Sequence, residues 1–103
     1  MFKDAQKEVD TWAQQHKKPY WDSLSQLAAL TEEVGEVARV MNHTHGDKVK
    51  KPTEDENDLG RELGDVLFAL ICIANKHEIE LDDAFTKSME KSRTRDKDRF
   101  EKK

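Results

Sequence analysis

The chain has 103 residues and a mass of 12.0 kDa, which corresponds to a single domain. Hydrophobic residues make up only 35% of it, and the longest apolar run, Val66–Ala74, is nine residues long. A membrane-spanning helix needs about 20 such residues, so a membrane protein is excluded. Cys72 is the only cysteine, which rules out an internal disulfide, and the charged start does not resemble a signal peptide. We therefore expect a soluble, reduced, cytoplasmic protein.

Charge is unevenly distributed along the chain. Residues 87–103 hold eight basic and four acidic side chains (net +4), whereas residues 1–86 hold 10 basic and 18 acidic ones (net −8). A nucleic-acid-binding domain carries a basic stripe on its folded part, so nucleic acid is not an expected partner. The distribution instead suits a body that binds cations and a tail that binds phosphate oxygens. The end of this tail, about residues 96–103, could be disordered.

Four helices are predicted, because apolar residues recur at helical spacing and no segment alternates for long enough to predict a strand. The first covers roughly residues 2–16 and ends before Pro19. The second covers roughly residues 23–42, with Asp22 or Ser23 as its N-cap.

The third helix is predicted over roughly residues 54–76, with Thr53 and Glu56 as a capping box. It contains Val66–Ala74, which is apolar on every face and should lie inside a bundle or a subunit interface. The fourth helix runs from about residue 81 towards residue 95. The prediction is an all-α, four-helix bundle-like protomer formed by residues 1–103 as one domain, with a core shared in a dimer or a dimer of dimers.

Two groups of acidic residues lie on these helices. Glu32, Glu33 and Glu36 fall within an arc of about 100° around the second helix. Glu62 and Asp65 are three residues apart on the third. Such carboxylates often form an ordinary solvated face. Here, like charges within one and a half turns repel one another, and a divalent cation would offset this repulsion.

The ligand chemistry of these groups favours particular metals. Carboxylate oxygens favour Mg²⁺ or Mn²⁺ over Zn²⁺. A di-iron bundle would need Glu-x-x-His pairs, and none of the four histidines has a glutamate three residues before it. Each acidic group also contains a glycine, Gly35 or Gly64, which costs about 1 kcal/mol relative to alanine in a helix. These glycines suggest the close approach of another backbone or of a ligand.

The pattern E-E-x-x-E, a 25-residue gap and E-x-x-D resembles the MazG-like nucleotide pyrophosphohydrolases, which belong to the all-α nucleoside triphosphate pyrophosphatase superfamily. The flanking segments 30–39 and 62–68 match as well, and the likeness covers roughly residues 5–100. It implies a helical dimer or dimer of dimers with active sites in clefts between helices. It also implies cleavage of the α–β bond of a nucleoside triphosphate, which yields a monophosphate and pyrophosphate.

The resemblance also assigns roles to the acidic residues. The ligands of one or more Mg²⁺ ions, with Mn²⁺ as the alternative, would be Glu33, Glu36, Glu62 and Asp65. Glu32 matches an extra leading glutamate and is the candidate to orient or deprotonate the attacking water. The metal would neutralise triphosphate charge and lower the pKa of bound water.

Other side chains are candidates for substrate binding. Asn75 could bind sugar or phosphate, or it could simply end the third helix. A basic face on the fourth helix could bind phosphate or be ordinary solvated surface; it is formed by Lys87, Lys91 and Arg95. Trp12, Tyr20 and Trp21 are candidates for stacking on a base; Trp21, beside a loop, is the preferred one, whereas Trp12 is expected rather in the core.

The predicted function is Mg²⁺-dependent hydrolysis of (deoxy)nucleoside triphosphates, which would clean the nucleotide pool. Three alternatives remain open: a phosphoribosyl-ATP pyrophosphatase, a non-catalytic helical interaction module, and a nucleotide sensor. The base preference does not follow from the resemblance, because the polar loop at residues 43–58 is fairly long and would help to shape the pocket.

Overall fold

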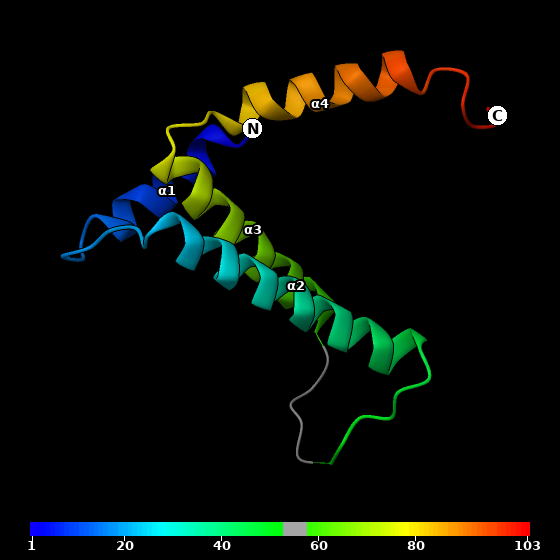
Figure 1. The fold of residues 1–103 in the computed structure, drawn as a ribbon, viewed down its shortest axis with the longest axis horizontal. Coiled ribbons are helices and arrows are strands. Elements are labelled where there is room, and N and C mark those ends of the chain that lie inside the picture. Colours follow the sequence, from blue (N-terminus) through cyan, green and yellow to red (C-terminus); the bar gives the residue numbers. More distant parts are fainter. Residues whose placement is uncertain (53–57) are drawn as a thin grey trace.

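The computed structural model describes residues 1–52 and 58–103, which form four α-helices and no strand (Figure 1). The helices are α1 (Lys3–Ala13), α2 (Ser23–His45), α3 (Leu59–Lys76) and α4 (Leu81–Arg95). The prediction of an all-α chain with four helices is therefore confirmed. None of the described helices is long and apolar enough to cross a membrane.

The helices α2 and α3 lie antiparallel and side by side, and α1 packs against α3 (Figure 1). By contrast, α4 is attached near its first residues and projects away from the α2–α3 pair. The backbone N–H of Phe2 donates to Asp82 Oδ1 at 2.7 Å, and the Phe2 and Phe85 rings lie 5.5 Å apart. No described residue of α4 is buried. The fourth helix is thus joined to the start of α1 and does not lie along the other helices.

The first residue of α3 differs from the prediction. Asp58 has an extended backbone (φ −129°, ψ 94°), and its side chain accepts a hydrogen bond from the Arg61 N–H at 3.0 Å. This is N-cap geometry, so α3 begins at Leu59 and not at residue 54. The proposed capping box, Thr53 and Glu56, lies outside the described residues. At the other helices, α1 ends earlier than predicted, at Ala13, and α2 continues to His45.

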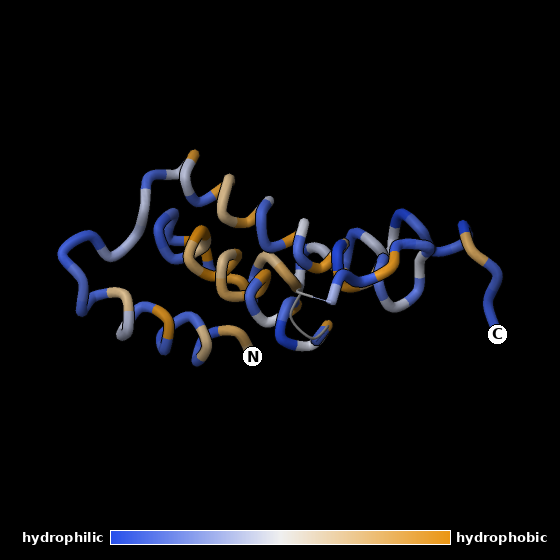
Figure 2. The backbone as a smooth tube through the Cα atoms, turned by 90° about the horizontal axis from the view of Figure 1, so that it is seen from below, coloured by the Kyte–Doolittle hydropathy of each residue, from blue (hydrophilic) through white to orange (hydrophobic). Residues whose placement is uncertain are grey.

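The interior of the chain is small. Among the described residues, the buried hydrophobic side chains are Ala13, Val40, Ile71 and Ala74. Hydrophobic positions concentrate in the middle of the molecule, whereas the C-terminal part is mostly hydrophilic (Figure 2). Within Val66–Ala74, Leu67 and Phe68 are still 42% and 43% exposed. The single chain therefore does not cover this apolar run on all sides.

A hydrogen-bond network joins α1, the segment before α2 and the end of α3. The Tyr20 hydroxyl donates to Asp10 Oδ1 at 2.6 Å and accepts from Asn75 Nδ2 at 3.0 Å. Asn75 Nδ2 also donates to the Gln6 carbonyl, and Asn75 Oδ1 accepts from Gln6 Nε2, both at 3.0 Å. The Asn75 amide thus connects three segments that are far apart in the sequence.

Tyr20 offers a spectroscopic test of this network, because it is the only tyrosine in the chain. Burial, together with the hydrogen bond to Asp10, raises the pKa of Tyr20 to about 12. Ultraviolet titration of the folded protein should therefore show phenol ionisation near pH 12, against about 10 in the unfolded chain.

The same shift predicts how stability changes with pH. Because the folded state holds the phenol proton more tightly, the stabilisation by Tyr20 is complete below about pH 10 and is lost as the pH rises towards about 12. Tyr20→Phe should lack this alkaline loss, as measured by urea unfolding at several pH values. Ionisation of the folded protein near pH 10 would contradict the prediction.

Candidate metal centre and adjoining pocket

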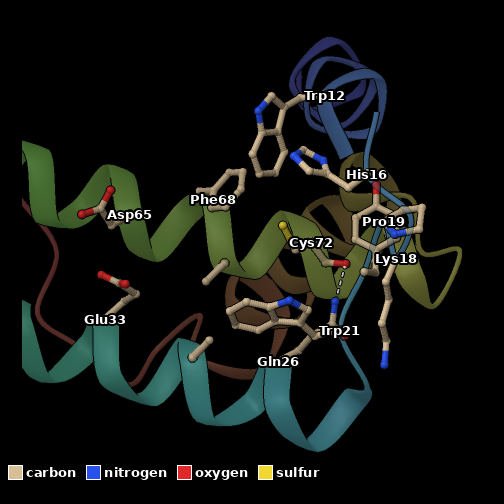
Figure 3. Close-up of a pocket in the computed structure, with 13 residues that line it drawn as sticks. Trp12, His16, Lys18, Pro19, Trp21, Gln26, Glu33, Asp65, Phe68 and Cys72 are labelled. Atoms are coloured by element: carbon tan, nitrogen blue, oxygen red, sulfur yellow. Dashed lines mark hydrogen bonds between the residues drawn. The ribbon is translucent and has the colours of Figure 1, made fainter. Parts of the chain in front are cut away.

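Three of the predicted metal ligands converge between α2 and α3. Glu33, Glu62 and Asp65 each offer a carboxylate oxygen, and these oxygens lie within 4.8 Å of one another. Glu33 comes from α2, and the other two come from neighbouring positions on one face of α3. Glu33 and Asp65 point toward one another across the space between the two helices (Figure 3). The fold thus places the two separate sequence motifs at one point.

The electrostatics of this cluster suit a cation. Partial burial raises the pKa of Glu33, and the negative charges of Asp65 and Glu62 raise it further. Holding these carboxylates close together therefore costs the folded chain electrostatic free energy, and a positive ion between them would offset this cost. Oxygen-only donors are the ligands that Mg²⁺ and Mn²⁺ prefer. The residues at this point fit a hard divalent metal.

The other two acidic residues of the motif lie beside this cluster. The Glu36 carboxylate accepts a hydrogen bond from Arg39 Nε at 3.0 Å, and it is not among the three converging groups. Glu32 is exposed. Both are close enough for their charges to raise the pKa of Glu33. Metal binding by Glu36 and a catalytic role for Glu32 stay predictions.

A pocket of about 510 Å³ adjoins the carboxylates, and Glu33 and Asp65 form part of its wall. Its volume lies in the usual range for small-molecule sites, about 300–1,000 Å³. The rest of the wall comes from α1, from the segment before α2 and from the facing sides of α2 and α3 (Figure 3). Its principal side chains are Trp12, His16, Lys18, Trp21, Gln26 and Phe68.

Both tryptophans lie at this pocket. Trp21, the predicted stacking residue, lines it and is 59% exposed. The sequence predicts Trp12 in the core, and this prediction is wrong. Trp12 is 51% exposed and contacts Phe68 edge to face, with the ring centroids 5.6 Å apart. The reason is that α1 packs mainly against α3, so its apolar side is covered only in part. Sequence reasoning missed His16, Lys18 and Gln26, although Gln26 lies two helical turns before Glu33 and therefore on the same face.

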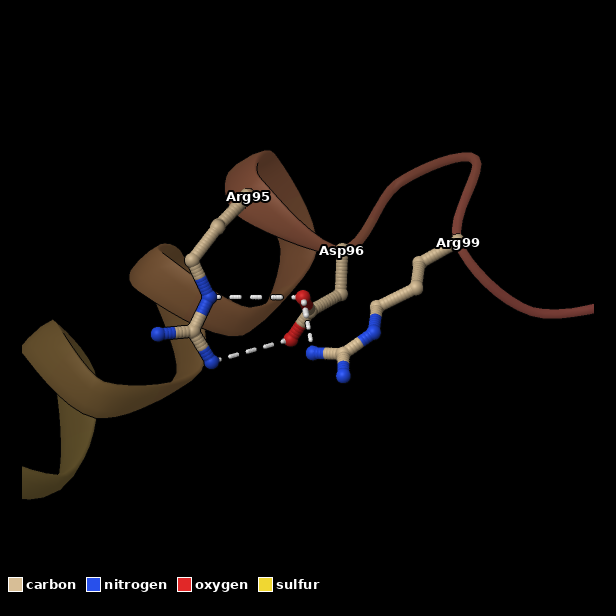
Figure 4. Close-up of polar contacts among 3 residues, drawn as sticks. All are labelled: Arg95, Asp96 and Arg99. Carbon is tan, nitrogen blue, oxygen red and sulfur yellow. Dashed lines mark hydrogen bonds and ion pairs between the residues drawn. The ribbon is translucent and has the colours of Figure 1, made fainter.

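The remaining predicted substrate-binding residues lie elsewhere in the single chain. The Asn75 amide is used in the network with Gln6 and Tyr20. Lys87 and Lys91 lie on the projecting α4. At its end, Arg95 donates to both carboxylate oxygens of Asp96, from Nε at 3.3 Å and Nη2 at 3.2 Å, and Arg99 pairs with the same carboxylate (Figure 4). Phosphate binding by these residues stays a prediction.

A family model described as the MazG nucleotide pyrophosphohydrolase domain matches residues 22–100, which include both acidic motifs. The chain belongs to this MazG family. Its resemblance to MazG-like proteins, inferred from the acidic motifs, is therefore confirmed.

Known relatives of this MazG domain agree with it over nearly its whole length. The uncharacterized protein YpjD of Bacillus subtilis (strain 168) is 50% identical over 102 residues, which are 99% of this chain and 92% of YpjD. A crystal structure of Bacillus subtilis YpjD matches 91% of this chain and 96% of its own, with 47% identity and a TM-score of 0.82. A Bacillus-conserved MazG protein, described as a nucleotide pyrophosphohydrolase, covers 95% of each chain with 46% identity and a TM-score of 0.79.

Proposed function

We propose that this chain hydrolyses nucleoside triphosphates, with ribose or deoxyribose, to a nucleoside monophosphate and pyrophosphate in the presence of Mg²⁺. The observation that carries the proposal is the convergence of Glu33, Glu62 and Asp65 at a pocket of nucleotide size. Membership of a family of nucleotide pyrophosphohydrolases supports the reaction class. Removal of unwanted nucleotides in the cytoplasm would be the physiological use.

In the proposed site, Glu33, Glu62 and Asp65 hold the metal, and Glu36 joins them when it turns from Arg39. A bound Mg²⁺ or Mn²⁺ supplies positive charge next to the triphosphate and lowers the pKa of a bound water. Glu32 orients the attacking water or accepts its proton. The pocket wall holds the nucleoside, with Trp21 stacking on the base. The chain's own contribution is therefore mainly positioning and charge.

The proposed assembly is a homodimer or homotetramer. Apolar side chains remain exposed on α2 and α3, including Leu27 (55%), Val34 (50%) and Leu63 (51%). A second copy that packed on these helices would remove this apolar surface from water, which favours association. It could also bring Lys87, Lys91 and Arg95 of its own α4 to the triphosphate. Light scattering at micromolar concentration should give at least twice the mass of one chain, and a single-chain mass would contradict this assembly.

Product analysis tests the reaction. Purified protein with Mg²⁺ or Mn²⁺ is incubated with canonical and modified nucleoside triphosphates and with phosphoribosyl-ATP, and the products are separated by chromatography. Monophosphate and pyrophosphate should appear, EDTA should abolish them, and Glu36→Gln should lower their rate of formation. Glu8→Gln, on an exposed side of α1, is the matched control and should leave the rate unchanged.

The same panel separates the alternatives. Turnover of phosphoribosyl-ATP alone would favour the phosphoribosyl-ATP pyrophosphatase. Nucleotide binding without turnover would favour a sensor. If no nucleotide is either bound or hydrolysed, a helical interaction module becomes the better explanation, and then Glu33→Gln and Asp65→Asn should leave partner binding intact. Orthophosphate and a diphosphate as the products would contradict cleavage between the α- and β-phosphates.

A further inference from the structure

Gln26 is a buried polar side chain in the wall of the pocket. It is 5% exposed and is the only polar residue in the buried class among the described parts of the chain. Burial of an amide is tolerated when its donors and acceptors find partners. Only the nitrogen of the Gln26 amide has a hydrogen-bond partner, and the position of Gln26 in the pocket suggests a partner for its oxygen.

The orientation of the Gln26 amide follows from its neighbour. Its nitrogen Nε2 donates to the backbone carbonyl of Cys72 on α3 at 3.1 Å (Figure 3). A carbonyl oxygen only accepts hydrogen bonds, so the nitrogen must face Cys72 and the oxygen Oε1 must face elsewhere. Oε1 is buried and has no hydrogen-bond partner in the described chain. The site therefore holds an oriented acceptor that lacks a donor.

The position of Gln26 relates this acceptor to the metal centre. Gln26 lines the same pocket as Glu33 and Asp65, and it lies at the other end of that pocket, beside Trp21 (Figure 3). A ligand whose phosphates face the carboxylates would direct its base toward Gln26. Trp21 lines the same pocket and is 59% exposed, so much of its ring surface is available for stacking on that base. When the face of the base stacks on Trp21, the edge of the base is the part that remains to contact Oε1 of Gln26.

We propose that Gln26 determines base specificity: Oε1 accepts a hydrogen bond from an N–H group on the Watson–Crick edge of the substrate's base. The nature of the ligand rests on the proposed function. Because Nε2 is committed to Cys72, the side chain presents only an acceptor and favours an amino or imino group over a carbonyl oxygen. A pocket built in this way discriminates strongly against analogues that lack the donor, because Oε1 then stays unpaired.

The test measures binding without turnover. Non-hydrolysable α,β-methylene triphosphates of the four common nucleosides are compared with analogues in which the edge N–H is replaced by C–H or the amino group is removed. Quenching of tryptophan fluorescence gives Kd, because both tryptophans of the chain line the pocket. For the preferred base, loss of the donor should raise Kd by on the order of 10- to 100-fold in the wild-type protein. In Gln26→Met, which keeps the side-chain length, the same loss should change Kd by less than about threefold.

The outcomes separate the base site from the reaction. A wild-type protein that binds no nucleotide, or binds all analogues as well as their parents, overturns the role of Gln26 even if Gln26→Met does not fold. Equal discrimination in wild type and Gln26→Met also overturns it, because a group other than Oε1 would then recognise the edge of the base. Base discrimination that depends on Gln26, without hydrolysis of the parent triphosphates, would support the base site and overturn the proposed reaction.

Discussion

Glu33→Gln is expected to lower kcat/KM for triphosphate hydrolysis by on the order of 10²–10³ and, in the absence of metal, to raise the melting temperature. Activity falls because Glu33 is the α2 member of the converging carboxylates. Stability rises because partial burial and neighbouring carboxylates raise the pKa of Glu33, so the folded chain disfavours its ionised form. A neutral amide at this position removes both the burial of a charge and the repulsion from the neighbouring carboxylates.

The measurement is a pair of thermal unfolding experiments, in EDTA and in excess Mg²⁺, together with the rate of pyrophosphate release. Mg²⁺ should raise the melting temperature of the wild-type protein and have a much smaller effect on Glu33→Gln. Glu8→Gln should behave as wild type in all three assays. A Glu33→Gln protein that melts lower than wild type without metal would contradict the electrostatic argument. Full activity in that variant would contradict the metal site.

Asn75→Ala is expected to destabilise the protein by about 2–3 kcal/mol, because it removes three part-buried hydrogen bonds, to the Gln6 side chain, the Gln6 carbonyl and the Tyr20 hydroxyl. Urea unfolding measures this change. The exposed amide variant Gln15→Ala should stay within about 0.5 kcal/mol of wild type.

Asn75→Ala also tests the role expected for this residue from the sequence. If Asn75 serves the substrate and not the fold, its substitution should raise KM and leave the free energy of unfolding nearly unchanged. The hydrogen-bond network predicts the reverse: the free energy of unfolding falls, and the KM of the protein that remains folded changes little.

The helices were predictable from sequence because apolar spacing and end signals agree. For α2, Ser23 follows the extended Asp22, and for α4 the acidic first turn and basic last turn mark both ends. The start of α3 differs from the prediction, since the expected cap was Thr53 and the observed N-cap is Asp58, five residues later. Propensity alone does not decide between Thr53 and Asp58 as the residue where the helix begins.

The acidic residues could be found from sequence because their spacing within each helix is fixed by the helical repeat. Their convergence across α2 and α3 needed the packing of the two helices. The pocket was harder to predict, since helical periodicity does not reveal whether an apolar face, such as that of Trp12, is covered by a neighbour. A Cβ added at Gly35 or Gly64 would meet nothing within 4 Å among the described residues of this chain, so the close approach of a ligand or of a second copy to these glycines stays a prediction.

Gln26 and Glu33 lie on one uninterrupted helix, seven residues apart. This spacing corresponds to about 10.5 Å along the axis and about 20° around it. Helix pitch, and not a loop, therefore sets the separation between the proposed base contact and the proposed metal ligand. A one-residue insertion between them would rotate one relative to the other by about 100°, whereas a substitution at position 26 leaves the carboxylates in place. Selectivity for the base could thus change by point substitution while the hydrolytic machinery stays intact.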